Sequence, residues 1–123
     1  MHKFRELKVW QRAMDFAMEI YRLSADFPKA EQFGLTSQIR RATTSIVLNI
    51  AEGAGSGSDL EFQRFLSYAL RSTYEVMAAL EIGQRPGYCA PDHAQTLLTE
   101  SDEIAAMLVG LSRSLNRKKK SDI

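Results

Sequence analysis

The stretch that decides the fold is Phe33–Gly53, FGLTSQIRRATTSIVLNIAEG. Its apolar residues recur at intervals of three and four, so that at 100° per residue one narrow sector holds Leu35, Ile39, Ala42, Ile46 and Ile50. The run 43–47 is rich in β-branched residues, but the two-residue alternation of a strand fails, because residues 46–48 are all apolar. The stretch is therefore predicted to form a helix over residues 35–53, with Gly53 as its C-cap.

A first helix is predicted over residues 6–25. Apolar side chains recur there at helical spacing, at Trp10, Ala13, Ala17 and Ile20. Phe27 precedes Pro28, and the residue before a proline disfavours the helical region of backbone space. The helix is therefore expected to end before this dipeptide.

Two further helices are predicted, over residues 59–85 and 91–116. Ser58 and Glu61 have the spacing of a capping box, in which each side chain binds the other residue's free backbone amide. Pro86-Gly87 is a strong turn signal, and the neighbouring Tyr88 is expected to anchor the turn. A proline at position 91 suits the first turn of a helix, where its missing N–H costs nothing.

Four amphipathic helices with short connections predict an all-α protein, an antiparallel up-down-up-down four-helix bundle. The chain of 123 residues is long enough for one such domain, and we expect residues 1–123 to form a single bundle with a basic C-terminal tail at 117–123. No internal repeat indicates the alternative, an open helical array.

Composition narrows the location and the partners. A single cysteine excludes an intramolecular disulfide, no window approaches the ~20 apolar residues that span a bilayer, and residues 1–11 lack a secretion signal. We expect a cytoplasmic protein with no membrane partner. The net charge is +1, but residues 113–123 carry five Lys or Arg against one Asp, while the other residues carry 11 Lys or Arg against 14 Asp or Glu. A solvated tail and a nucleic-acid contact both remain open.

No constellation for catalysis, cofactor binding or metal binding emerges. Cys89 and His93 are close in sequence but lie at a turn without an orienting acid. Gly53–Gly57 follows a helix rather than a strand and lacks the Lys-Ser/Thr of a phosphate-binding loop. The glutamates lack the Glu-x-x-His pairs of metal-binding bundles. The chain is therefore predicted not to be an enzyme, to hold no cofactor and to have no small-molecule substrate.

Two surfaces of the helix at 35–53 are candidates for interaction. A polar ladder is formed by Gln38, Arg41, Asn49 and Glu52, with Ser45 between them, and it is either a hydrogen-bonded network or a solvated edge. Leu48 points outward, nearly opposite the core residues Ile46 and Leu35. Together with Ile82 and Ala79 on the third helix and a second apolar row on the first, it predicts a self-association surface. The interface candidates are Val47, Leu48, Phe16 and Ile82.

FGLTSQIRRATTSIVLNIAEG, the later SDLEFQRFL and a Gly-Tyr turn resemble the four-helix-bundle family named for the 23S ribosomal RNA intervening sequence protein. The resemblance covers about residues 4–115. It implies a ring-like homo-pentamer without attached enzymatic activity and mostly without an assigned role. Related proteins serve as accessory factors of diversity-generating retroelements, where a basic surface contacts nucleic acid and a reverse transcriptase.

The resemblance and the residues together favour a homo-oligomeric scaffold or adaptor. RNA or DNA is the alternative partner, and its candidate contacts are Arg40, Arg41, Arg117, Lys118, Lys119 and Lys120. Relatives often carry arginines in the glycine loop, where this chain has Ser56 and Gly57, which removes charge that would neutralise phosphates.

Overall fold

The computed structural model of the chain describes the backbone of residues 1–121 and the side chains of residues 1–116. Four helices account for most of this part of the chain: α1 (Lys8–Ala25), α2 (Leu35–Ala54), α3 (Asp59–Gln84) and α4 (Pro91–Ser121). Two short 3-10 helices, η1 (Phe4–Glu6) and η2 (Lys29–Glu31), precede α1 and α2. No strand occurs within residues 1–121, so the predicted all-α, four-helix class is confirmed.

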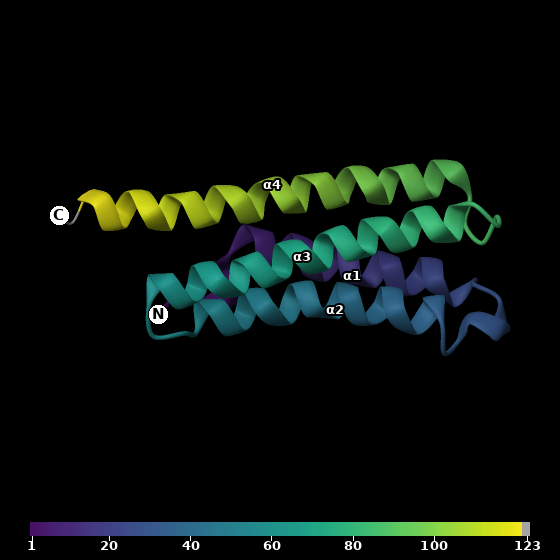
Figure 1. Cartoon of the computed structure of the whole chain (residues 1–123), viewed down its shortest axis with the longest axis horizontal. Helices are drawn as coiled ribbons and strands as arrows, with labels where there is room; N and C mark the ends of the chain where they lie inside the picture. The colour runs from purple at the N-terminus through teal and green to yellow at the C-terminus, as the bar shows by residue number, and fades with distance from the viewer. Residues whose placement is uncertain (122–123) are drawn as a thin grey trace.

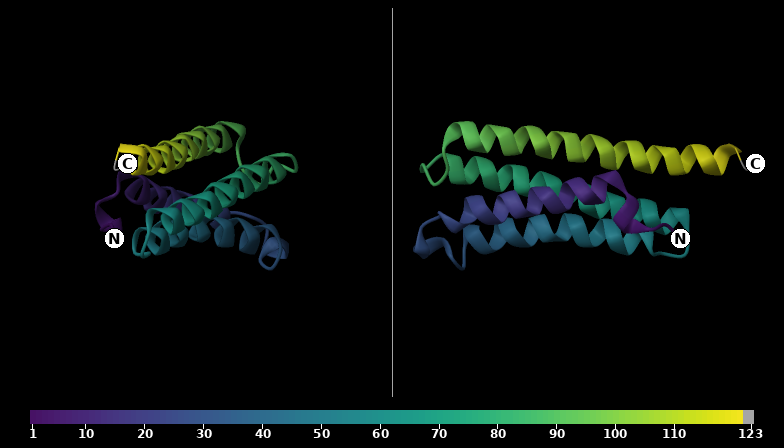
Figure 2. Two further views of the ribbon diagram at one scale, coloured as in Figure 1. Left: turned by 60° about the vertical axis from the view of Figure 1, so that its left-hand side comes forward. Right: turned by 180° about the vertical axis from the view of Figure 1, so that it is seen from behind.

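Successive helices run in opposite directions. Figure 1 shows the α1–α2 connection and the α3–α4 turn at one end of the molecule, with the α2–α3 connection and the C-terminus at the other. The view from behind in Figure 2 shows α1 between α2 and α4. Side-chain contacts agree: Ser45 of α2 meets Ser72 of α3, and Arg12 of α1 meets Glu100 of α4.

One hydrophobic cluster draws on all four helices. Its largest fully buried side chains include Phe16, Ile20, Ile39, Ile46, Ile50, Phe62, Leu66, Leu80, Ile104 and Leu108. The predicted apolar sector of α2 therefore lies in the core, at Leu35, Ile39, Ala42, Ile46 and Ile50. Burial of such side chains contributes roughly 1.5–3 kcal/mol each. None of the helices in the described part of the chain combines the length and hydropathy that crossing a bilayer requires.

Four predicted helix ends differ from the structure: the start of α1 and the ends of α2, α3 and α4, of which α3 ends at Gln84 rather than at residue 85. The first helix begins at Lys8 rather than at residue 6, because Phe4–Glu6 is a separate 3-10 turn and Leu7 is extended. The last helix continues past residue 116 to Ser121 and so includes most of the predicted tail. No proline or glycine interrupts residues 111–121, and cations near a helix C-terminus interact favourably with its dipole.

Gly53 is not the C-cap of α2. The helix runs on to Ala54, and Gly55 occupies the cap position with φ −84°. Gly53 instead lies directly against α3. A Cβ atom added there would lie 2.7 Å from the Phe65 Cβ and 2.9 Å from the Phe62 Cδ1. The glycine is needed for packing between helices, not for ending one.

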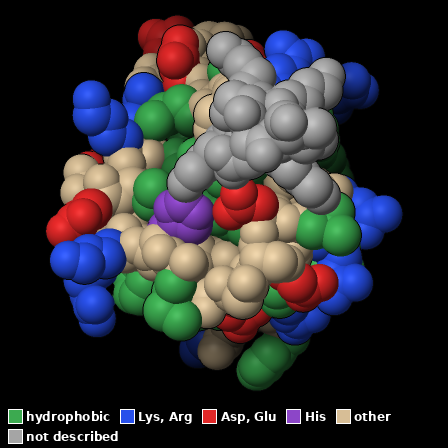
Figure 3. All heavy atoms as spheres, turned by 90° about the vertical axis from the view of Figure 1, so that its left-hand side faces the viewer, with side chains coloured by type: hydrophobic (Ala, Val, Ile, Leu, Met, Phe, Trp, Pro, Cys, Tyr) green, Lys and Arg blue, Asp and Glu red, His purple; other side chains and the backbone are tan. Residues whose placement is uncertain are grey.

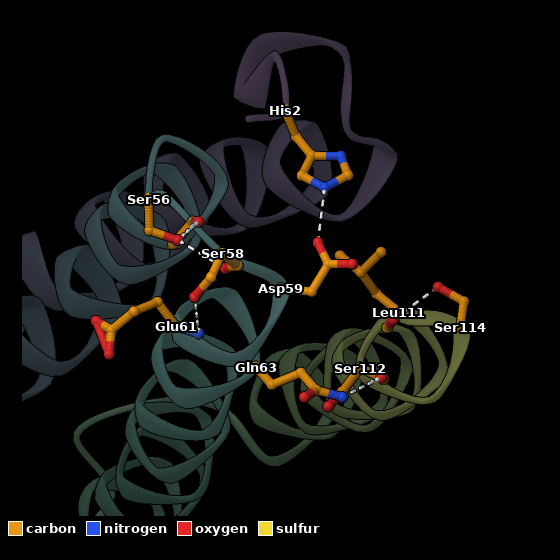
Figure 4. Close-up of polar contacts among 10 residues, drawn as sticks. His2, Ser56, Ser58, Asp59, Glu61, Gln63, Leu111, Ser112 and Ser114 are labelled. Atoms are coloured by element: carbon orange, nitrogen blue, oxygen red, sulfur yellow. Dashed lines mark hydrogen bonds and ion pairs between the residues drawn. The ribbon is translucent and has the colours of Figure 1, made fainter. Parts of the chain in front are cut away.

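The start of α3 forms only half of the predicted capping box. The Glu61 amide donates to the Ser58 Oγ at 3.1 Å (Figure 4). The Glu61 carboxylate does not return to Ser58 but pairs with Arg64 at 2.8 Å. The N-terminal residues close over this end: the His2 amide donates to the Ala54 carbonyl at 2.7 Å, and the His2 ring lies 5.0 Å from that of Phe62. The ring nitrogen of His2 also faces Asp59, as the close-up shows.

The turn between α3 and α4 is anchored as the sequence predicts. Gly87 has φ +86°, and the Tyr88 amide donates to the Gly83 carbonyl at 2.9 Å, which is the Schellman pattern of a helix end. The Tyr88 hydroxyl donates to Glu31 of η2 at 3.1 Å. The other carboxylate oxygen of Glu31 accepts the first amide of α2, from Leu35. One glutamate therefore ties the two connections at this end together.

Candidate interaction surfaces

An apolar groove lies on the outside of the bundle between α1 and α2. We call it the α1–α2 groove; it has a volume of about 330 Å³ and is lined mainly by Met14, Ala17, Met18, Tyr21, Val47 and Leu48. Leu48 is 58% exposed and Met18 is 45% exposed. Thr44 also lines the groove, but its hydroxyl donates to the Arg40 carbonyl of its own helix. The groove therefore presents a nearly continuous apolar surface to solvent.

The predicted interface residues occupy different environments. Leu48 and Ile82 are exposed as expected, whereas Phe16 is only 2% exposed and Ala79 is also buried, so neither of those two offers surface to another subunit. Val47 is mostly buried, between the helices of its own bundle. Leu48 and Ile82 do not share a patch, because Leu48 lies one turn before Gly53, near the α2–α3 connection, and Ile82 lies near Gly87. The exposed neighbours of Leu48 are Met18 and Tyr21, which the sequence reasoning missed.

Of the four residues predicted for the polar ladder of α2, only Asn49 takes part in a hydrogen-bonded network with other described side chains. The Asn49 amide donates to the Ser45 carbonyl at 2.8 Å and to its hydroxyl at 2.9 Å, and the Ser72 hydroxyl of α3 reaches the Ser45 hydroxyl at 2.9 Å. Gln38, Arg41 and Glu52 are exposed, and no bond to another described side chain is recorded for them. The network therefore joins α2 to α3 within one subunit.

Arg40 and Arg41 differ in their surroundings. The Arg40 guanidinium donates to the Ser24 hydroxyl at 2.8 Å and to the Tyr21 carbonyl at 3.1 Å, and it lies over the Tyr21 ring. These contacts hold Arg40 against the last turns of α1. Arg41 is exposed and takes part in none of these contacts. Arg41 is therefore the freer of the two predicted nucleic-acid contacts.

The other predicted nucleic-acid contacts, Arg117 and Lys118–Lys120, lie outside the residues whose side chains are described. Figure 3 looks at the end of the bundle where the chain termini lie. The side chains coloured there include both Lys or Arg and Asp or Glu around the rim. The described part of this face therefore carries mixed charge.

The Cys89–His93 pair does not have the features of a catalytic site. Cys89 is buried, and burial raises the pKa of its thiol, which opposes formation of the nucleophilic thiolate. His93 is exposed in the first turn of α4. Across the described residues, no group of three His, Cys, Asp or Glu side chains is placed to hold a metal ion.

A second and larger groove lies between α1 and α4. This α1–α4 groove has a volume of about 810 Å³; Phe16 and Leu97 contribute to its floor, and Asp15, Glu19, Arg22 and Glu100 are among its charged walls. Arg12 closes one end with a forked hydrogen bond to Glu100, at 2.5 and 3.1 Å. Glu19 pairs with Arg22 along α1. Nothing in the local sequence pattern indicated this groove.

These features define a small four-helix protein with two surface grooves and without a recognisable catalytic or metal-binding constellation among the described residues. The signature of the family described as 23S rRNA-intervening sequence protein matches residues 5–110, and the chain belongs to this family. The resemblance of the sequence to that family is thereby confirmed.

Solved structures agree with this assignment. One similar structure is that of a protein of unknown function from the S23 ribosomal protein family of Bacteroides thetaiotaomicron. It matches with a TM-score of 0.79 and 27% identity, over 85% of this chain and 95% of the other. None of the curated proteins matches the chain. The family and this relative carry no assigned function, and nothing in them indicates enzymatic activity.

Proposed function

We propose that the protein is a non-enzymatic, cytoplasmic, homo-oligomeric scaffold or adaptor whose subunits associate through the α1–α2 groove. The observation that carries this proposal is the exposure of Leu48 beside Met18 and Tyr21, in a groove with almost no free polar group. Contiguous exposed apolar surface marks sites of protein association. A pentamer is the assembly that the family resemblance implies.

The first test is the mass of the protein in solution. Light scattering at micromolar concentration is expected to give a multiple of the 13.9 kDa chain mass. A monomer mass under these conditions would mean that the assembly proposal is wrong. The Leu48→Glu variant is expected to dissociate, because an unpaired carboxylate buried at an interface costs several kcal/mol.

Leu60→Glu is the matched control. Leu60 is 66% exposed, close to the exposure of Leu48, but it lies in the first turn of α3, outside the groove. A carboxylate is tolerated near a helix N-terminus, so this variant should fold and assemble as the parent does. If Leu48→Glu assembles equally well, Leu48 lies outside the interface.

Nucleic-acid binding is the alternative function, favoured by the exposed Arg41 and by the five cations at 113–120. Binding of structured RNA should then weaken steeply as salt is raised, because phosphate contacts release counterions. Arg41→Gln should weaken it more than Arg40→Gln, since Arg40 already bonds within the chain. Failure to bind RNA or DNA at low salt ends this alternative.

A further inference from the structure

The charge of α4 is divided between its two ends. Residues 91–112 contain four Asp or Glu and no Lys or Arg, and residues 113–120 contain five Lys or Arg and no acid. The helix dipole favours such an order, but its influence falls off within the first and last turns. Glu100, Asp102 and Glu103 lie well inside the helix, as does the exposed Arg113. The dipole therefore accounts for only part of the division.

The acidic part of α4 forms one wall of the α1–α4 groove. Glu100 faces the groove from α4, and Asp15 and Glu19 face it from α1. Arg22 lies on the same α1 wall, paired with Glu19, and Arg12 pairs with Glu100 at the groove's end. Asp15 is exposed, and no ion pair to a described side chain is recorded for it. Three carboxylates against two arginines, Arg22 and Arg12, leave the groove with an excess of one negative charge, at Asp15. Its floor is formed by the buried side chains of Phe16 and Leu97.

The basic segment of α4 cannot reach the groove of its own subunit. Arg117 lies 17 residues beyond Glu100 on one continuous helix, which separates them by about 25 Å at 1.5 Å per residue. Figure 1 shows the C-terminal end of α4 at the opposite end of the molecule from the α3–α4 turn, where the groove residues of α4 begin. Any contact between the two charged regions must therefore join different copies of the chain.

We infer that the basic end of α4, residues 113–120, docks in the α1–α4 groove of a second copy of this chain. This inference rests on the self-association proposed above and adds a second contact to it. Five positive charges meet a groove that carries the unpaired carboxylate of Asp15 and whose volume of about 810 Å³ accommodates long side chains. Such electrostatic complementarity selects the partner and fixes its register more than it adds affinity.

The test is a charge swap measured by light scattering and sedimentation at low ionic strength. A tail variant, Lys118→Glu/Lys119→Glu/Lys120→Glu, and a groove variant, Asp15→Lys, should each weaken self-association by at least about tenfold, because like charges then face each other. Their combination in one chain should recover most of the loss. Glu75→Lys, an exposed site on α3 outside the groove, makes the same charge change as Asp15→Lys and should have no effect.

A peptide assay keeps the inference testable if a variant assembles through other surfaces or fails to fold. A fluorescent peptide of residues 111–123 should bind the tail variant, whose groove is free of its native occupant, and binding should weaken with salt. Adding Asp15→Lys to that host should weaken peptide binding by at least about tenfold, and adding Glu75→Lys should not.

Three results would overturn the inference. The first is unchanged association of the tail variant while Leu48→Glu dissociates the protein, an outcome that leaves the proposed function intact. The second is equal peptide binding to hosts carrying Asp15→Lys and Glu75→Lys. The third is a tail variant that loses RNA binding and keeps self-association, because the basic segment would then contact nucleic acid rather than the groove.

Discussion

The α2–α3 and α1–α4 contacts join antiparallel helices in the same bundle, yet they are built differently. Between α2 and α3, Gly53 lies directly against Phe62 and Phe65, and the small hydroxyls of Ser45 and Ser72 meet at 2.9 Å. Between α1 and α4, a forked pair of long side chains, Arg12 and Glu100, spans the gap beside the α1–α4 groove. Small residues allow close helix approach, and long charged ones hold helices apart.

This difference separates a rigid part of the molecule from an adaptable one. Tight packing in the α2–α3 contact leaves no room for added atoms, so its residues are fixed by neighbours on both helices. The α1–α4 contact has a groove of about 810 Å³ on its outside and is bridged by side chains that are partly exposed. A binding surface is therefore more compatible with the second contact than with the first.

The largest effect on stability is expected from adding a methyl group at Gly53, in the tightly packed α2–α3 contact. Gly53→Ala places a methyl group 2.7 Å from the Phe65 Cβ, so the helices must separate or the side chains must move. Overpacking of this kind costs typically 1–3 kcal/mol. Urea unfolding at neutral pH should show that loss in the free energy of unfolding.

Gly57→Ala is the control, because nothing lies within 4 Å of the added methyl group and the residue does not have positive φ. At such a position alanine is neutral, or stabilising by about 0.4–1 kcal/mol, since it restricts the unfolded chain. Equal stability of Gly53→Ala and Gly57→Ala would show that the α2–α3 contact is looser than described.

A smaller effect on stability is expected from removing the Arg12–Glu100 pair that joins α1 to α4. Arg12→Gln removes a pair whose side chains are 40% and 30% exposed, and such pairs contribute about 0.2–1 kcal/mol. The loss, measured by urea unfolding, should shrink at high ionic strength. Arg22→Gln is the control, since Arg22 pairs with Glu19 inside α1 and joins no two helices. If both variants lose the same stability, the bridge adds nothing as a link between α1 and α4.

The α2–α3 contact was only partly predictable from the sequence. Helical spacing over residues 35–53 identified the core positions of α2, because each buried residue recurs within one sector. Gly53 was noticed, but a glycine after an apolar run fits both a cap and a close approach, and local pattern does not separate them. Gly55, two residues further on, occupies the cap position instead.

The α1–α4 contact was not predictable from helical spacing. Arg12 and Glu100 are 88 residues apart, and each alone resembles an ordinary surface residue. The α1–α2 groove was half predicted: the outward direction of Leu48 follows from helix geometry, but its meeting with Met18 and Tyr21 depends on how α1 lies against α2. Surfaces made by two helices require tertiary packing, which spacing within one helix does not contain.

A third contact links the α1–α2 pair of helices to the α3–α4 pair. It joins the α1–α2 connection to the α3–α4 turn, which contains Tyr88. The hydroxyl of Tyr88 donates to Glu31, and this hydrogen bond, with burial as a lesser cause, raises the pKa of Tyr88 above its usual value of 10.0. The folded protein therefore holds this proton more tightly than the unfolded chain does. The resulting stability is fully present below the unfolded pKa and is lost as the pH rises through the higher, folded-state pKa.

Tyr88→Phe should remove this pH dependence, which is the smallest of the three expected effects. Urea midpoints of the parent and the variant, measured from about pH 8 to about pH 11, should converge as the pH rises. Cys89, whose pKa is also raised by burial, and the other tyrosines are common to both proteins, so their contributions cancel in the difference. Parallel curves over this range would mean that Tyr88 does not link the two pairs of helices through Glu31. Among the described residues, the side-chain hydrogen bonds between α1 and α4 are those that Arg12 donates to Glu100 and Met107.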